Sequence, residues 1–159
     1  MFVWRLQTRQ HKTETWVVAM IEKRLRTNIN FGQRRVLCVD DNALTMHLLS
    51  LILQQQGYDV LTSPDPITAI KVLKQGAVDL ALLDYEMPQM NGGELAAMVK
   101  CGGLATQVIL FSGNARIPQH DLVFVDRFVQ KSEGVKALLE AIESLLPITK
   151  RVLADVQQH

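Results

Sequence analysis

The stretch DLALLDYEMP, residues 79–88, carries the clearest structural signal in the sequence. Its apolar run, Leu80–Leu83, leads directly into a single acidic residue, Asp84, and Pro88 follows shortly after. A short apolar run without polar alternation is typical of a strand that is buried on both faces of a sheet. The stretch therefore predicts a buried strand that ends at Asp84.

Similar runs on either side of this stretch predict further strands. They are Val36–Val39, Tyr58–Leu61, Val108–Phe111 and Arg127–Gln130. Amphipathic segments separate the runs, and this alternation implies right-handed crossovers between parallel strands. A parallel sheet needs helices on both of its faces. The predicted fold class is therefore α/β, with a doubly wound five-stranded parallel sheet.

Capping residues and apolar spacing predict the helices. Asn42 is a candidate N-cap for the first helix, which ends before Gly57. The segment 63–66 begins the second helix, because proline is tolerated in a first helical turn, and Gly76 closes it. Pro88 and the glycines of segment 91–93 predict a loop before a helix over Glu94–Lys100.

The last helix is expected to have Ser132 as its cap and to stop near Pro147. Its apolar residues are expected to face inward, whereas the first helix is expected to gather its own apolar residues on one side. The residues are Val135, Leu138, Leu139, Ile142, Leu145 and Leu146 in the last helix, and Leu44, Leu48, Leu51 and Ile52 in the first.

Polar side chains follow the ends of four predicted strands. They are Asp40 with Asp41, Asp84, Ser112 and Lys131. Ligands bind outside the carboxyl ends of the strands in sheets of this kind, so these side chains are expected to converge. Crowded carboxylates repel each other unless a cation compensates, and Mg²⁺ prefers carboxylates, waters and a phosphate oxygen. The set predicts phosphoryl transfer to an aspartate, with a lysine that neutralises phosphoryl oxygens.

The same segments resemble the receiver domain of response regulators. The resemblance rests on VLCVDDN (36–42), DLALLDYEMP (79–88), Asn91-Gly92, Phe111-Ser112-Gly113 and FVQK (128–131), which occur in this order within residues 34–147. It implies a flavodoxin-like fold with strand order 2-1-3-4-5. It also implies that a histidine kinase or a histidine phosphotransfer protein donates a phosphoryl group to Asp84, in a two-component phosphorelay.

The resemblance further implies a role for each polar residue of the site. Asp41, Asp84 and the backbone carbonyl of Glu86 would bind Mg²⁺, with Asp40 in the outer shell, and Lys131 would pair with the phosphoryl oxygens. Ser112 would move toward the phosphoryl group and the Phe128 ring would follow it inward, as a switch. Glu86 and Asn114 would influence the lifetime of the phosphoryl group.

Two departures from the family pattern stand out. Ser132 follows Lys131 where the family usually has proline, so a trans peptide bond and an altered loop are expected. The connection from Ser112 to Phe128 is short and Pro118 interrupts it, so its helix is expected to be abbreviated or irregular.

The chain is expected to consist of a basic extension (1–33), a receiver domain (34–148) and a short tail (149–159). Residues 1–35 contain eight basic and two acidic residues, although the net charge of the whole chain is only +1. The tail is too short for an appended output domain, which predicts a stand-alone receiver that acts on another protein. No apolar run is long enough to span a bilayer and the cysteines form no CxxC pair, so a cytoplasmic location is expected.

Two other functions compete with this interpretation. A phosphatase of the haloacid dehalogenase type also uses an aspartyl nucleophile and Mg²⁺, but its nucleophile lies in a DxD motif after the first strand. Here the first strand precedes Asp40-Asp41-Asn42, so the order differs. The basic extension could bind nucleic acid weakly, but no recognised binding motif accompanies it. A signalling receiver that is not an enzyme is the favoured interpretation.

Overall fold

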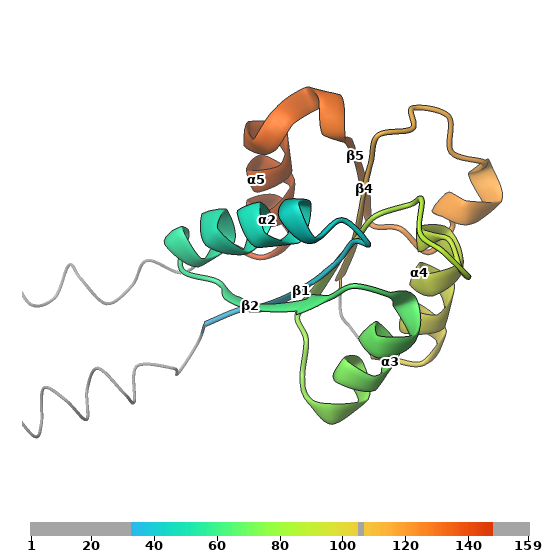
Figure 1. The fold of residues 1–159 in the computed structure, drawn as a ribbon, viewed down its shortest axis with the longest axis horizontal. Helices are drawn as coiled ribbons and strands as arrows, with labels where there is room; N and C mark the ends of the chain where they lie inside the picture. Colours follow the sequence, from blue (N-terminus) through green and yellow to red (C-terminus); the bar gives the residue numbers. More distant parts are fainter. Residues whose placement is uncertain (1–32, 105–106, 148–159) are drawn as a thin grey trace, which may run out of the picture. The chain divides into compact units, whose positions relative to one another are not determined.

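The computed structural model describes residues 33–104 and 107–147. Its centre is one parallel sheet in the order β2-β1-β3-β4-β5 (Figure 1). The strands are β1 (Arg35–Val39), β2 (Asp59–Ser63), β3 (Leu80–Leu83), β4 (Gln107–Ser112) and β5 (Arg127–Gln130). This confirms the predicted fold class and strand order. The domain boundaries at 33/34 and 148/149 adjoin residues outside the described ranges and stay a prediction.

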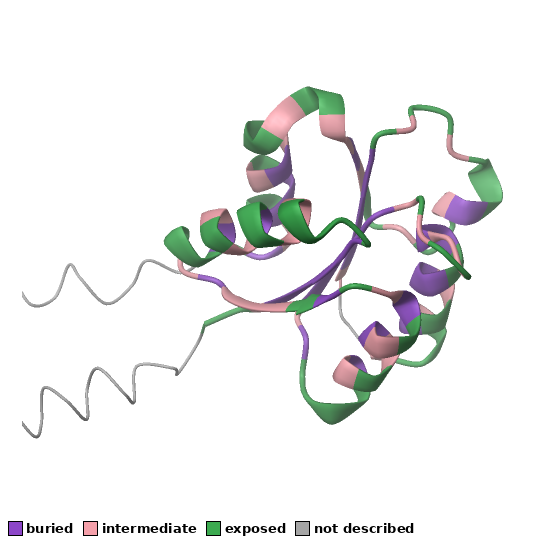
Figure 2. Cartoon of the chain, viewed as in Figure 1, coloured by how far each residue is buried: buried purple, intermediate pink, exposed green. Residues whose placement is uncertain are grey.

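Helices cover both faces of the sheet, and alternate strand residues point to the two faces. α2 (Ala43–Gln55) and α5 (Gly134–Leu145) pack on one face, where Leu53 and Ile142 meet strand residues such as Cys38. α3 (Pro66–Gln75) and α4 (Gly92–Cys101) pack on the other face, where Leu73 and Leu95 meet strand residues that alternate with those of the first face. The three central strands, β1, β3 and β4, are consequently the most continuously buried part of the described chain (Figure 2).

The side chains that cap α2 and α3 lie in the segments where the sequence predicts the helix starts. The Asn42 side chain accepts hydrogen bonds from the backbone N–H groups of Leu44 and Thr45 at 3.0 and 3.1 Å. Asp65 caps α3 in the same way, through the N–H of Thr68 at 2.7 Å. Such caps satisfy backbone donors that have no partner inside the helix.

The start of α4 differs from the prediction. The helix begins at Gly92, so the Gly92-Gly93 pair is helical and does not belong to the preceding loop. The cause is a reciprocal capping box, in which the side chains of Asn91 and Glu94 each accept the other residue's backbone N–H at 2.9 Å.

The prediction for the apolar side of α2 was wrong for three of its four residues. Leu44, Leu48 and Leu51 are exposed, and only Ile52 is partly buried. Leu49 and Leu53 face the core in their place. Apolar residues occur on both sides of this helix, so periodicity alone could not decide which side meets the sheet.

The segment after β5 also differs in detail. Lys131–Glu133 form a 3₁₀ turn, η2, and α5 begins at Gly134, so Ser132 does not cap the helix with its side chain. The Glu133 carboxylate caps η2, because it accepts the backbone N–H of Gln130 at 2.7 Å, and no side chain caps α5. The Lys131–Ser132 peptide bond is trans, as expected.

The inward face of α5 is mostly as predicted. Leu138, Ile142 and Leu146 are buried, and Leu139 and Leu145 pack against them. Val135 is exposed, which contradicts the prediction, because it lies in the first turn, beyond the edge of the sheet contact.

The connection between β4 and β5 holds a single short helix, the 3₁₀ turn η1 (Gln119–Leu122). This agrees with the expectation of an abbreviated helix in this connection. Pro118 immediately precedes this turn. Within residues 33–104 and 107–147, no helix combines the length and apolarity that a membrane crossing needs.

Candidate functional site

Three carboxylates meet at the carboxyl edge of the sheet. Asp40 and Asp41 follow β1 and Asp84 follows β3, and these two strands are neighbours in which Val39 pairs with Leu83. One oxygen from each of the three carboxylates lies within 4.8 Å of the others. Asp40 and Asp84 are buried, whereas Asp41 is exposed. The predicted convergence of these residues is therefore present.

Lys131 supplies the compensating cation from the end of β5. Its Nζ lies 2.9 Å from Oδ2 of Asp40 and 2.9 Å from Oδ1 of Asp84. The ammonium also lies 5.9 Å from the centre of the Phe111 ring, within the range of a cation–π contact. Phe111 was not predicted to belong to the site. Its position in the buried strand β4 gave it the appearance of an ordinary core residue.

The pKa shifts of Asp84 and Lys131 reflect a competition between burial and pairing. Burial raises the pKa of Asp84 above 3.8, and the opposing effect of Lys131 does not reverse this. Burial also lowers the pKa of Lys131, but its bonds to Asp40 and Asp84 outweigh that effect and raise it above 10.5. The site thus keeps its lysine charged while an excess of negative charge remains.

Ser112 is the last residue of β4 and Asn114 lies in the loop that follows it, at the same edge of the sheet as the cluster. Ser112 is fully buried, and its Oγ accepts the backbone N–H of Asn114 at 3.0 Å. The side-chain amide of Asn114 donates to Oε1 of Glu86 at 3.5 Å, a long contact that links the loops after β3 and β4. A Cβ atom added at Gly113 would have no atom of another residue outside its chain neighbours within 4 Å, so this loop has room beside Ser112.

Phe128 is partly buried and packs with the core on the α3 and α4 face. The predicted roles of Ser112 and Phe128 in a switch, and of Glu86 and Asn114 in phosphate lifetime, stay predictions.

Sequence reasoning missed a further pair next to the site. The hydroxyl of Tyr85 donates a 2.7 Å hydrogen bond to Oδ2 of Asp121, which is buried in η1. Only the position of Tyr85, directly after Asp84, could have indicated that it lies near the site. Asp121 lies in an irregular segment with no periodicity from which its orientation could be predicted.

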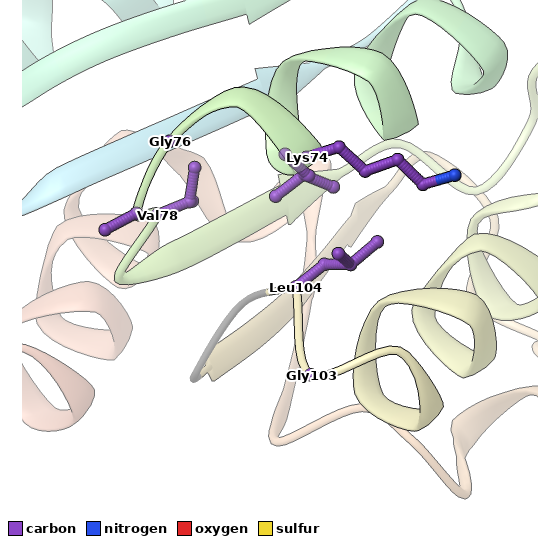
Figure 3. A pocket seen from close by; sticks show the side chains of 7 residues that line it. Lys74, Gly76, Val78, Gly103 and Leu104 are labelled. Atoms are coloured by element: carbon purple, nitrogen blue, oxygen red, sulfur yellow. The ribbon is translucent and has the colours of Figure 1, made fainter.

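A pocket lies at the opposite ends of the same strands. The ends of α3 and α4 and the segments that precede β3 and β4 form it, and its lining includes Leu73, Lys74, Val78 and Leu104 (Figure 3). The lining contains no acidic residue, and in Figure 3 the Lys74 amine extends away from the labelled glycines. The pocket therefore has no part in the acidic site.

The acidic site fits a magnesium ion. Mg²⁺ is a hard cation that binds carboxylate oxygens and retains several waters. Two buried carboxylates and one exposed carboxylate provide such ligands. Together they outnumber the single ammonium of Lys131, and the exposed carboxylate leaves access to solvent. Asp40, Asp41 and Asp84 are the described residues that could hold the ion, and the predicted part of the Glu86 carbonyl stays a prediction.

The chain is similar to known signalling proteins. A family model for the response regulator receiver domain matches residues 36–143. The transcriptional regulatory protein GlrR of Escherichia coli (strain K12) is 30% identical over 121 residues, which cover 72% of this chain and 27% of that protein. The sensor kinase/phosphatase CqsS of Vibrio cholerae is 35% identical over 68 residues, which cover 43% of this chain and 10% of that protein. The chain thus matches only a small part of each of these relatives.

Solved structures agree with these matches. The response regulator TrrA of Thermotoga maritima, in complex with Mg²⁺-BeF, is 32% identical with a TM-score of 0.66, and the match covers 72% of this chain and 100% of TrrA. A complex of TrrA with the histidine kinase ThkA gives 31% identity and the same TM-score, and covers 72% of this chain and 99% of that chain. With the family model matching well over half of the chain, this protein belongs to the response regulator receiver domain family.

Proposed function

We propose that this protein accepts a phosphoryl group on Asp84 from a histidine kinase or a histidine phosphotransfer protein, and that the modification changes which protein it binds. The cluster of Asp40, Asp41 and Asp84 around Lys131 is the observation that carries this proposal. The receiver TrrA, whose structures include a Mg²⁺-BeF complex and a histidine kinase complex, supports it by similarity.

Each residue of the cluster has a distinct task. A carboxylate oxygen of Asp84 attacks phosphorus, the new O–P bond forms, and the bond from phosphorus to the donor nitrogen breaks. Bound Mg²⁺ would neutralise charge on the transferring phosphoryl oxygens. Lys131 lies 2.9 Å from Asp84 and can pair with the same oxygens after transfer. The hydroxyl of Ser112, whose oxygen accepts the N–H of Asn114, can then donate its hydrogen to the phosphoryl group.

The exposed leucines of α2 suggest where the donor protein docks. Leu44, Leu48 and Leu51 are 77%, 53% and 46% exposed, and α2 starts directly after Asp40 and Asp41. A partner that brings a phosphohistidine to Asp84 would bury this apolar surface, which is costly to leave in water. The signalling role needs no further enzymatic activity, so we propose that the chain is not an enzyme in its own right.

Neither competing function gains support. Membership of the receiver family, and the position of Asp84 after β3, argue against a haloacid dehalogenase type of phosphatase. Binding of nucleic acid was predicted only from the basic extension, which lies outside the described residues.

Phosphorylation by a small donor tests the acceptor. The full chain is incubated with Mg²⁺ and acetyl phosphate, and intact mass should show one added phosphoryl group that alkali removes. Asp84→Asn should show none. Asp41→Ala should react more slowly because a magnesium ligand is lost, whereas Arg34→Ala should react normally because Arg34 pairs with Asp79 at the opposite edge of the sheet. Undiminished labelling of Asp84→Asn would refute the assignment.

Docking is tested separately with the cognate kinase. Leu48→Asp should slow transfer from the phosphorylated kinase and leave the reaction with acetyl phosphate unchanged, because only the protein donor needs α2. The matched control is Val123→Asp, a charge placed on an apolar residue after η1 that is even more exposed than Leu48. Equal transfer to Leu48→Asp and wild type would exclude α2 as the docking surface.

A further inference from the structure

Tyr85 is held at two points by two different elements. Its backbone carbonyl accepts the N–H of Gly92, the first residue of α4, at 3.0 Å. Its hydroxyl donates to Oδ2 of Asp121 in η1 at 2.7 Å. The second oxygen of Asp121 lies 3.6 Å from Nε2 of the exposed His120. Tyr85 thus connects the loop after Asp84 both to α4 and to η1.

Close packing reinforces this connection. A Cβ atom added at Gly93 would lie 2.5 Å from Cβ of Asp121, and one added at Gly92 would lie 2.2 Å from the carbonyl oxygen of Asp84. Contacts this short mean that η1 and the end of β3 both rest directly on the first turn of α4. Of the buried polar residues in the described chain, Asp121 is the one that lies in η1. Its buried carboxylate accepts the hydrogen bond from Tyr85.

The position of Tyr85 in the chain gives the connection a consequence for the site. Tyr85 lies between Asp84 and Glu86 in the chain, so the two hydrogen bonds that hold Tyr85 limit how far the backbone at Glu86 can move. We infer that Tyr85 is a positioning residue for the magnesium site, with Asp121 as the partner that fixes it. This inference rests on the proposed function, because it assumes that the acidic cluster binds Mg²⁺.

The coupling must act in both directions. If the Tyr85–Asp121 bond favours the geometry that binds the metal, metal binding strengthens that bond by the same factor. Two backbone hydrogen bonds in and beside η1 can report this effect: Asp121 N–H to Pro118 O at 3.0 Å, and Val125 N–H to Leu122 O at 3.1 Å. Mg²⁺ bound at the acidic cluster should therefore slow hydrogen exchange at these two amides.

Calorimetric titration of the full-length protein with Mg²⁺ alone tests the inference. Tyr85→Phe should weaken Mg²⁺ binding by roughly tenfold, the lower end of the range for residues that orient metal ligands. Asp121→Leu should weaken it similarly, whereas Asp121→Asn, which keeps an oxygen acceptor, should recover most of the affinity. The matched control is Tyr58→Phe, which removes a hydroxyl bonded to Leu146 O at 3.3 Å in the other core, and should bind as wild type does.

Hydrogen exchange with and without Mg²⁺ supplies the second measurement. The metal should slow exchange at Asp121 and Val125 in wild type, and much less in Tyr85→Phe. Thermal unfolding first establishes that each variant is folded. A folded Tyr85→Phe that is less stable but binds Mg²⁺ as tightly as wild type would overturn the inference, because the pair would then be structural only. A wild-type protein that binds no Mg²⁺ would overturn both the inference and the proposed function.

Discussion

The ammonium of Lys131 is shared between Asp84 and Asp40, at 2.9 Å from an oxygen of each. Replacing it with the similarly long side chain of methionine leaves three carboxylates without their cation. Lys131→Met should lower the free energy of unfolding by about 1–2 kcal/mol, a reduced figure because the lysine is partly exposed. Urea denaturation without Mg²⁺ measures this loss.

The same variant should bind Mg²⁺ roughly threefold to tenfold more tightly, because a competing positive charge is gone. Phosphorylation by acetyl phosphate should nevertheless become slower. Lys136→Met is the control, since Lys136 is exposed and pairs only with Glu140 at 3.8 Å. Weaker Mg²⁺ binding by Lys131→Met would contradict this electrostatic account.

The raised pKa of Asp84 predicts how stability depends on pH. A group whose pKa is higher in the folded state than in the unfolded state favours folding below its unfolded value and loses that contribution as the pH rises. Ionised Asp84 should therefore cost stability at neutral pH. Asp84→Asn should unfold at a higher temperature than wild type at pH 7 without Mg²⁺, and the difference should shrink at about pH 3.5.

Asp65 provides a control of opposite sign. Hydrogen bonds from the Thr68 backbone and side chain lower the pKa of Asp65, so its ionised form stabilises the protein above its unfolded pKa and the effect fades as the pH falls. Asp65→Ala should lower the unfolding temperature at pH 7 and have less effect in acid.

An Asp84→Asn protein less stable than wild type at pH 7 would show that Lys131 more than offsets the burial of the carboxylate.

Gly92 should not tolerate a side chain. Alanine normally favours a helix over glycine, but here its Cβ would meet the carbonyl oxygen of Asp84 at 2.2 Å and the side chain of Leu110 at 2.6 Å. Gly92→Ala should cost about 1–3 kcal/mol in urea denaturation. Gly113→Ala, where the structure leaves open space, should change stability by less than about 0.5 kcal/mol. Equal stability of the two variants would mean that the α4 terminus can move away from Asp84.

Ser112 should matter for the conformational response and not for accepting phosphate. Its Oγ accepts the N–H of Asn114 in the structure, which leaves the hydroxyl hydrogen available to donate to a phosphoryl group. Ser112→Ala should still be phosphorylated on Asp84. Amide NMR shifts caused by the phosphoryl mimic beryllofluoride should become smaller around Phe128 and α5.

The matched control for this variant is Ser144→Ala, which removes a hydroxyl bonded to Ala141 O within α5. Its shifts around Phe128 should equal those of wild type. Full-size shifts in Ser112→Ala would show that the response leaves the site through another route, such as the Lys131–Glu133 turn.

The parts of the fold that sequence could predict are those with one dominant signal. The doubly buried strands read as uninterrupted apolar runs, and Asp40, Asp84 and Lys131 follow them directly, so the edge at which they meet was predictable. The side of α2 that packs on the sheet could not be predicted, because Leu44 and Leu49 are equally apolar. Only the geometry of the sheet determines which of them is buried. The Tyr85–Asp121 bond joins a loop to an irregular turn, where no periodic pattern exists to indicate direction.

The bond between Lys131 and Asp40 joins residues that lie 91 positions apart in the chain. The two residues follow strands β5 and β1, with β3 and β4 between them in the sheet. During synthesis, a chain that has not yet added β5 holds the acidic residues without their lysine, and long-range strand pairings of this kind form late. The cluster of Asp40, Asp84 and Lys131 is therefore complete only after the last strand has joined the sheet.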